Sequence, residues 1–258
     1  MNDLVSIICP SYNCAGLISQ TINSVLSQTY RNWELLILDD ASTDGTDKVV
    51  APYLEMDERI RFYPHAVRSG AALERNQGIQ LARGRWIAFL DSDDLWTPDK
   101  LEKQIRFMEE NGYSFSYTMY SEMDSDGKDT GVLVTGPKRI TRSGMYAYCW
   151  PGCLTIMYDA NAVGLIQIED IKKNNDYAIW LKISKKADCY LLREVLAKYR
   201  RGRAGSVSTH GLFTLIKWHY YLFRRAEKKS VFSSLWHTGV NLVCGAFKKI
   251  WYVKRNGN

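Results

Sequence analysis

Residues 84–94 read Gly-Arg-Trp-Ile-Ala-Phe-Leu-Asp-Ser-Asp-Asp. The segment 86–90 is apolar at every position, which is typical of a strand that is covered on both faces of a sheet. Asp91, Asp93 and Asp94 follow this segment directly and place three carboxylates within four residues. The stretch therefore predicts a central strand of an α/β sheet that ends in an acidic cluster.

Apolar runs and helical patterns alternate through the first 110 residues on both sides of this stretch. We expect strands at 4–9, 33–38, 60–63 and 86–90, and helices at 16–28, 46–54, 71–82 and 97–110. Thr97 and Pro98 are typical of the N-cap and the first position of the last helix. This alternation predicts a Rossmann-type, mainly parallel sheet with helices on both faces.

Polar residues follow three of these strands at their carboxyl ends. Pro-Ser-Tyr-Asn occupies 10–13, Asp39 and Asp40 end the second strand, and the acidic run occupies 91–94. Ligands of open α/β sheets bind outside the carboxyl ends of the strands. We therefore expect these three clusters to meet at one edge of the sheet.

The acidic run is a candidate cation site. Like charges this close destabilise one another unless protons or a cation relieve them, and carboxylate oxygens suit Mg²⁺ or Mn²⁺. The alternative is a solvated turn before the next helix, with Asp99 near the start of that helix. Asp39 and Asp40 leave two possibilities as well: a carboxylate that accepts from a nucleobase or a ribose hydroxyl, or helix capping, which Ser42 or Asp44 could also supply.

The composition is that of a globular protein with one substantial core. Of 258 residues, 46% are apolar and 24% are charged. The start of the chain lacks the pattern of a signal peptide, and no stretch reaches the roughly 20 apolar residues that cross a bilayer. The six cysteines show no set of four ligands at zinc spacing, so we expect free thiols in a reducing cytoplasm.

Positive charge is concentrated at the end of the chain. Residues 198–258 contain 13 Lys and Arg against one acid, Glu227, which gives +12, so the rest of the chain carries −6 of the net +6. From 213 onward two helical stretches, broken near Ser230, mix aromatic and basic residues. Such a basic amphipathic tail can lie in an anionic membrane interface, or it can pack on the core with solvated lysines. No recognised nucleic-acid-binding motif accompanies it.

Several of these motifs together resemble family 2 glycosyltransferases of the GT-A fold. The resemblance is dense in the first hundred residues, at 5–13, 24–30, 39–46, 75–76, 82–87 and 90–94. It continues more loosely through 175–181 and 199–208. It implies a catalytic domain at 1–210, with a nucleotide-binding half at 1–120 and an acceptor half at 121–210, followed by a basic helical tail at 211–258.

The resemblance also implies roles for matching residues. The residues expected to bind the nucleotide are Pro10, Tyr12, Asp40, Arg75, Asn76, Asp91 and Ser92. Asp91 and Asp93 form the DxD pair that holds Mn²⁺ or Mg²⁺, with Asp93 as the direct ligand.

The second half of the chain would supply the base and further phosphate contacts. Asp176 takes the place of the catalytic base, although Asn175 stands where the family usually has an acid, and Asp170 is the alternative. Arg200, Arg203 and Ser206 would contact the diphosphate from a mobile loop. His210 is a further possible metal ligand.

The implied activity is inverting transfer of a single hexosyl residue. The donor is a nucleoside diphosphate sugar, taken to be a UDP-sugar. The acceptor is a hydroxyl of a polyprenyl-diphosphate-linked oligosaccharide, as in bacterial O-antigen, capsule or teichuronic-type polysaccharide assembly on the inner face of the cytoplasmic membrane. The alternatives are a non-catalytic nucleotide-sugar-binding or scaffold protein, and a sugar nucleotidyltransferase, which would carry a Gly-rich loop and Lys after the first strand.

Overall fold

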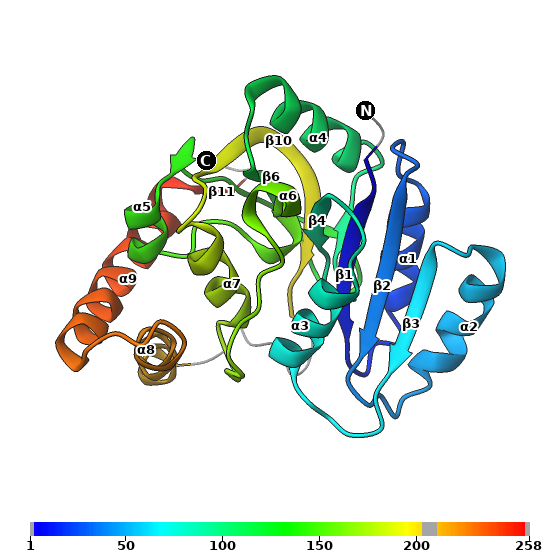
Figure 1. Ribbon diagram of the computed structural model, residues 1–258, viewed down its shortest axis with the longest axis horizontal. Helices are drawn as coiled ribbons and strands as arrows, with labels where there is room; N and C mark the ends of the chain where they lie inside the picture. The colour runs from blue at the N-terminus through cyan, green and yellow to red at the C-terminus, as the bar shows by residue number, and fades with distance from the viewer. Residues whose placement is uncertain (1–2, 203–210, 256–258) are drawn as a thin grey trace.

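The computed structural model describes residues 3–202 and 211–255, and within these ranges one eleven-stranded sheet runs through the molecule. Its main path has the order β11-β7-β6-β9-β4-β1-β2-β3 (Figure 1). The strands of the first half are β1 (Val5–Ser11), β2 (Trp33–Asp39), β3 (Ile60–Pro64) and β4 (Trp86–Phe89). These four strands are parallel, as predicted.

Helices cover both faces of this parallel part because successive strand residues point to opposite sides. On one side, Ile8 and Phe89 pack toward α3 (Ala71–Leu81) and α7 (Asn175–Ile183). On the other side, Ile7 and Leu90 belong to a second core cluster. The helices that complete the second cluster are α1 (Ile18–Leu26), α2 (Thr46–Met56) and α4 (Lys100–Asn111). The predicted α/β fold is confirmed.

The second half of the sheet is mixed rather than parallel. Its strands are β5 (Leu95–Trp96), β6 (Phe115–Met123), β7 (Asp129–Val134), β8 (Arg139–Ile140), β9 (Met157–Asp159), β10 (Cys189–Arg200) and β11 (Val253–Arg255). β9 lies antiparallel between β4 and β6, whereas β10 runs parallel to β6. The hairpin of β6 and β7 turns at 124–128, so the parallel pattern inferred from the first 110 residues does not extend beyond them.

Two local predictions need correction. The last helix of the first half begins at Lys100, not at Thr97, because the Thr97 hydroxyl is bonded to the Asp99 carboxylate at 2.7 Å instead of capping the helix. The segment 131–151 also contains a helix that was not predicted, α5 (Arg142–Ala147), which is capped by the hydroxyl of Thr141. Six residues are too few to show a helical period in the sequence. Shorter elements α6 (Ala160–Val163) and η1 (Cys153–Thr155) complete this half.

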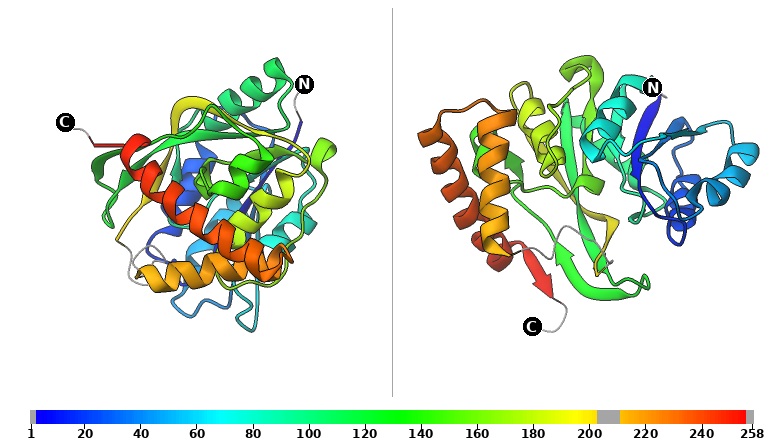
Figure 2. Two further views of the ribbon diagram at one scale, coloured as in Figure 1. Left: turned by 90° about the vertical axis from the view of Figure 1, so that its left-hand side faces the viewer. Right: turned by 90° about the horizontal axis from the view of Figure 1, so that it is seen from below.

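The tail forms a helical hairpin that returns to the sheet. It consists of α8 (Leu212–Tyr221), the π-helical turn η3 (Leu222–Ala226) and α9 (Val231–Trp251). Figure 2 shows α8 and α9 side by side on the outside of the molecule. Phe223 is fully buried in the core cluster that includes α7, and β11 pairs with β7. No helix in the described ranges has the length and apolar character that crossing a membrane requires.

Candidate active site

The three polar clusters meet at the carboxyl ends of β1, β2 and β4, at the lower edge of the sheet in Figure 1. The amide of Asp40 donates to the Ser11 carbonyl at 2.9 Å, which joins the first two clusters. The Cys14 thiol donates to the Ser92 carbonyl at 3.1 Å, which ties the first loop to the acidic run. The convergence expected from the sequence is therefore present.

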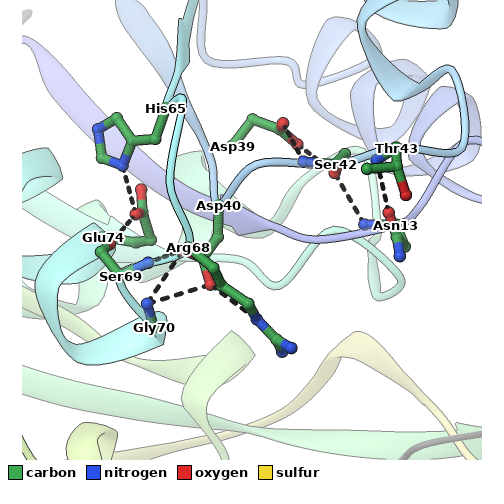
Figure 3. A network of polar contacts seen from close by, with 10 residues as sticks. All are labelled: Asn13, Asp39, Asp40, Ser42, Thr43, His65, Arg68, Ser69, Gly70 and Glu74. Atoms are coloured by element: carbon green, nitrogen blue, oxygen red, sulfur yellow. Dashed lines mark hydrogen bonds and ion pairs between the residues drawn. The ribbon is translucent and has the colours of Figure 1, made fainter.

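The adjacent acids Asp39 and Asp40 have separate partners (Figure 3). Asp39 accepts from the backbone amide and the hydroxyl of Ser42, at 3.0 and 2.6 Å, and so fixes the turn before α2. Asp40 accepts instead from the amides of Ser69 at 2.5 Å and Gly70 at 3.0 Å. The local, turn-forming role suggested for the pair applies to Asp39, and Asp40 faces the loop before α3.

The loop before α3 brings a cation to Tyr12. The guanidinium of Arg68 lies over the Tyr12 ring, 3.8 Å from its centroid, and Arg68 Nε is 3.4 Å from the Asp40 carboxylate. The Arg68 side chain is 63% exposed, so only these contacts orient it. An aromatic face, a buried carboxylate and an exposed cation thus lie together at this corner. Arg68 carried no sequence signal, because it stands in a loop without periodicity.

A buried carboxylate holds this loop in place. Glu74 accepts from the Ser69 hydroxyl at 2.5 Å and contacts His65 Nδ1 at 2.6 Å (Figure 3). Burial raises the pKa of Glu74, although its bonds to Ser69 and His65 oppose that shift. The position of the loop, and with it the place of Arg68, is therefore set from within the fold.

The three carboxylates of the acidic run differ in environment. Asp94 is buried and accepts from the Arg200 amide at 2.8 Å, and burial together with the charges of Asp93 and Asp91 raises its pKa well above the usual range. Asp91 and Asp93 are half-buried at the cleft. Among the described residues no group of three potential ligands gathers around one point. Carboxylate oxygens such as those of Asp91 and Asp93 are ligands that Mg²⁺ and Mn²⁺ prefer.

Arg75 joins the two halves of the site. Its buried guanidinium donates to the Asp91 carboxylate at 2.6 Å and to the side-chain oxygen of Asn175, at the start of α7. Burial alone would lower the pKa of Arg75, but the charges of Asp91 and then Asp176 outweigh burial and raise it. The guanidinium is thus a permanent cation between the acidic run and α7.

Asn76, next to Arg75, has a different role. Its side-chain amide donates to the Ile168 carbonyl at 2.7 Å and its oxygen accepts from the Ile168 amide at 2.9 Å. Both polar groups of Asn76 therefore serve the loop before α7. Of the predicted pair, Arg75 is the one that faces the acidic run.

Asp176 lies in the first turn of α7, on the same cleft. Burial raises its pKa; the Arg75 charge opposes that shift and the Asp91 charge adds to it, so these three groups act on one another. The alternative base, Asp170, is exposed, and its neighbour Glu169 pairs with Lys182 at 3.2 Å. A half-buried carboxylate with a raised pKa is suited to accept a proton.

Arg200 corrects one sequence expectation. It ends β10 instead of lying on a mobile loop, and it is buried. Its guanidinium donates to the carbonyls of Asp93 and Ser125, each at 2.9 Å, and to the side chain of Gln20. Arg200 therefore holds the backbone of the acidic run in place through hydrogen bonds, which is a structural role. Three further expected residues, Arg203, Ser206 and His210, lie outside the described residues.

Comparison with known proteins agrees with this site. The model of the family "Glycosyl transferase family 2" matches residues 6–150. The chain is 40% identical to TuaG of Bacillus subtilis, a glycosyltransferase assigned to teichuronic acid biosynthesis, over 90% of the chain and 92% of TuaG. It is also 40% identical to WfaP of Escherichia coli, "UDP-Glc:alpha-D-GlcNAc-diphosphoundecaprenol beta-1,3-glucosyltransferase", over 83% of the chain and 84% of WfaP.

Solved structures show the same fold. Residues 1–349 of TarS from S. aureus, in complex with UDP-GlcNAc, superpose with a TM-score of 0.68 at 18% identity, over 90% of the chain and 70% of that structure. The mannosyltransferase PcManGT from Pyrobaculum calidifontis, in complex with GDP-Man and Mn²⁺, gives 0.66 at 17% identity, over 95% and 75%. These likenesses confirm the GT-A-like fold. The family match, together with its relatives, shows that this chain is a glycosyltransferase of glycosyl transferase family 2.

Proposed function

We propose that this glycosyltransferase moves a single hexosyl residue, with inversion, from a UDP-sugar to a hydroxyl of a polyprenyl-diphosphate-linked oligosaccharide in bacterial surface polysaccharide assembly. The observation that carries the proposal is the bridge of Arg75 between Asp91 and Asn175, which puts the acidic run beside Asp176. Donor phosphates and a base can then act on one sugar. WfaP of Escherichia coli, a glucosyltransferase named for UDP-Glc and a diphosphoundecaprenol acceptor, supports the substrate class.

The nucleoside would bind at the corner formed by Tyr12, Asp40 and Arg68. The Tyr12 ring offers a face for a base to stack on, and Asp40 offers an acceptor for a base N–H or a ribose hydroxyl. Pro10, the one partly buried residue of β1, lies two positions before Tyr12. Arg68 already lies over Tyr12, so a base would take its place or stack beside it.

The diphosphate would lie at the acidic run. Asp91 and Asp93 would hold Mn²⁺ or Mg²⁺, and that cation, when bound, neutralises charge on the leaving diphosphate. Ser92 lies between the two acids with its carbonyl bonded to Cys14, which limits how far this loop can move. Arg75, buried next to Asp91, adds a fixed positive charge to the same region.

Asp176 would accept the proton of the attacking hydroxyl. Its raised pKa makes it a stronger base than an exposed aspartate, while the nearby guanidinium of Arg75 limits that shift and favours the ionised form. The hydroxyl oxygen attacks the anomeric carbon as the bond to the diphosphate breaks on the opposite face. One direct displacement converts an α-linked donor into a β-linked product.

The enzyme would work in the cytoplasm, peripherally on the inner face of the membrane that carries its acceptor. Support comes from the nine Lys and Arg residues at 211–255, which oppose a single acid. Basic residues this dense are attracted to an anionic leaflet.

A panel of UDP-hexoses tests the proposal. Each is incubated with the protein, a GlcNAc-diphosphate acceptor on a short alkyl chain, and Mn²⁺ or a chelator. We expect one donor to give a β-linked disaccharide by NMR, and no product with the chelator. An α-linked product would refute inversion. UDP binding without transfer would favour a non-catalytic binding protein, and pyrophosphate release from UTP and a sugar phosphate would favour a nucleotidyltransferase.

A further inference from the structure

The long helix α9 buries polar side chains and exposes large apolar ones, which is the reverse of an ordinary surface helix. Its inward face consists of small polar residues: Ser234, Thr238 and Asn241 are at most 3% exposed. Its large apolar side chains point outward instead. The most exposed of these are Phe232 (87%), Trp236 (71%), Val243 (71%), Ile250 (75%) and Trp251 (64%). We call these five residues, with Leu235 and Phe247 between them, the outer stripe.

The packing of the inward face fixes this orientation. The Thr238 hydroxyl donates to the Ser234 carbonyl at 2.7 Å, and the Asn241 amide donates to the Tyr146 carbonyl of α5 at 3.1 Å. The Ser234 hydroxyl in turn donates to the Ser230 carbonyl at 2.8 Å. Turning the helix to bury the outer stripe would break the bond to α5, so the stripe stays outside.

An exposed apolar stripe of this length requires a cover. Residues 232, 236, 243, 247 and 250 follow one another at steps of three, four or seven, which places them on one side of a helix. The helix has 21 residues and is therefore roughly 30 Å long. Contiguous exposed apolar surface of this kind marks a site for another molecule or for a membrane.

The charge around the stripe decides between lipid and a second copy of the chain. Glu227 is the one acid among residues 211–255, and its side chain is 1% exposed because it bonds the Tyr146 hydroxyl and pairs with Lys185 at 2.7 Å. The exposed charges of the hairpin in the described ranges are all positive, among them Lys228 and Lys249. Two such surfaces would repel each other, whereas an anionic leaflet would attract either one.

Further cations lie beside the stripe at the same surface. A hollow of about 380 Å³ between α5 and α9 is lined by Trp236, Arg142 and Lys229. The cationic groups of Arg142 and Lys229 lie 5.9 and 5.0 Å from the centre of the Tyr146 ring. Apolar side chains bordered by cations match the boundary between acyl chains and phosphate headgroups.

We infer that α9 lies in the plane of an anionic lipid leaflet, with the outer stripe among the acyl chains and the neighbouring cations at the headgroups. This deepens the proposed function, on which it rests for the membrane-borne acceptor. The hairpin also contacts the catalytic helix: His219 of α8 is 3.5 Å from Asn174, the N-cap of α7, two residues before Asp176. Docking by this face would therefore hold α7 close to the leaflet that carries the acceptor.

The test is flotation of the full chain with lipid vesicles. Wild-type protein should float with vesicles of phosphatidylcholine and phosphatidylglycerol, and far less with phosphatidylcholine alone. The triple variant Phe232→Ser, Trp236→Ser, Ile250→Ser should bind at least about tenfold more weakly, because three large side chains no longer enter the lipid. Met56→Ser is the matched control: Met56 is 63% exposed on α2, at the opposite end of the molecule, and its loss should change nothing.

A second measurement needs no variant. Acyl chains brominated near the headgroup should quench the tryptophan fluorescence of the wild-type protein, through Trp236 and Trp251. Absence of both flotation and quenching would overturn the inference, and so would a wild-type dimer in lipid-free solution that the triple variant converts to a monomer.

Activity on the short-chain acceptor separates this inference from the proposed function. The triple variant should transfer sugar to that water-soluble acceptor at the wild-type rate, and loss of this rate would make the stripe part of the folded core, against the inference. Vesicle binding without transfer to any acceptor would refute the proposed function and leave the inference standing.

Discussion

Replacing Asp176 by asparagine should separate activity from stability. The substitution keeps the size of the side chain and removes both its negative charge and its ability to accept a proton. A positioned general base contributes a factor of about 10²–10⁴ to the rate, so the barrier should rise by about 3–5 kcal/mol. UDP binding should stay close to wild type, because Asp176 lies on α7, and Arg75 separates α7 from the acidic run that would hold the diphosphate.

The effect on stability should have the opposite sign. Burial raises the pKa of Asp176, so the folded protein binds that proton more tightly than the unfolded chain does. The stability contributed by the group is therefore greatest below the ordinary aspartate pKa of about 3.9, and it falls as the pH rises through that value toward the folded-state pKa. Asp176→Asn carries no charge to bury, so its melting temperature should exceed that of wild type at pH 7.

Initial transfer rates, UDP calorimetry and melting curves from acid to neutral pH check this prediction together. The advantage in melting temperature should shrink as the pH is lowered toward the ordinary aspartate pKa. Asp170→Asn is the control, because Asp170 is exposed and should alter neither quantity. Turnover of Asp176→Asn within about tenfold of wild type, or a lower melting temperature at pH 7, would refute the role and environment assigned to Asp176.

Five further substitutions test the site and the fold. Asp93→Asn should lower the transfer rate by about 10²-fold or more, whereas Asp94→Asn should stay near wild type, because Asp93 is partly exposed and Asp94 is buried. Transfer rates are measured over a range of Mn²⁺ concentrations, and an equal loss of rate in both variants would contradict this. Arg68→Gln should raise the KM for the donor about tenfold without changing the melting temperature. Arg200→Met should lower the free energy of unfolding in denaturant by at least about 2 kcal/mol, because it leaves the carbonyls of Asp93 and Ser125 unpaired. A stability loss in Arg68→Gln and a KM effect alone in Arg200→Met would contradict both assignments. Gly84→Ala should destabilise by about 1–3 kcal/mol, because its Cβ would lie 2.5 Å from the Leu4 carbonyl oxygen; an unchanged melting curve would show that the strand can shift.

The edge of the sheet where the site lies could be predicted from the sequence. Apolar runs that end in polar clusters identify parallel strands and their carboxyl ends, and the rule that ligands bind there needs no further information. The role of each acid could not be predicted in this way. Asp39 and Asp40 are neighbours, yet one turns to Ser42 and the other to the amides of Ser69 and Gly70. That division depends on the left-handed backbone at Ala41, where φ is 58°.

Residues held by distant contacts were the hardest to assign. The family resemblance placed Arg200 on a mobile loop as a diphosphate contact, but its partners are Asp93 and Gln20, far away along the chain. The side chain of Asn76 is likewise hydrogen-bonded to a distant residue, through the backbone amide and carbonyl of Ile168. In the tail, the positive charge and the helices could be predicted from the sequence, whereas the exposure of the outer stripe could not. A periodic apolar face ordinarily predicts the buried side, and only the bond of Asn241 to α5 and the exposure of the apolar side chains show that this helix is reversed.

Arg75 explains how a site this rich in acids stays folded before a donor arrives. The charge of Asp91 raises the pKa of Asp176, and the buried guanidinium of Arg75 opposes that shift. Asn175 accepts one bond from Arg75 without adding a further negative charge, so the cation remains available to the two carboxylates. Under the proposed mechanism a metal-bound diphosphate would give Asp91 a second positive partner. The field of Arg75 would then act more strongly on Asp176 and on the leaving group, where negative charge must be held as the sugar is transferred.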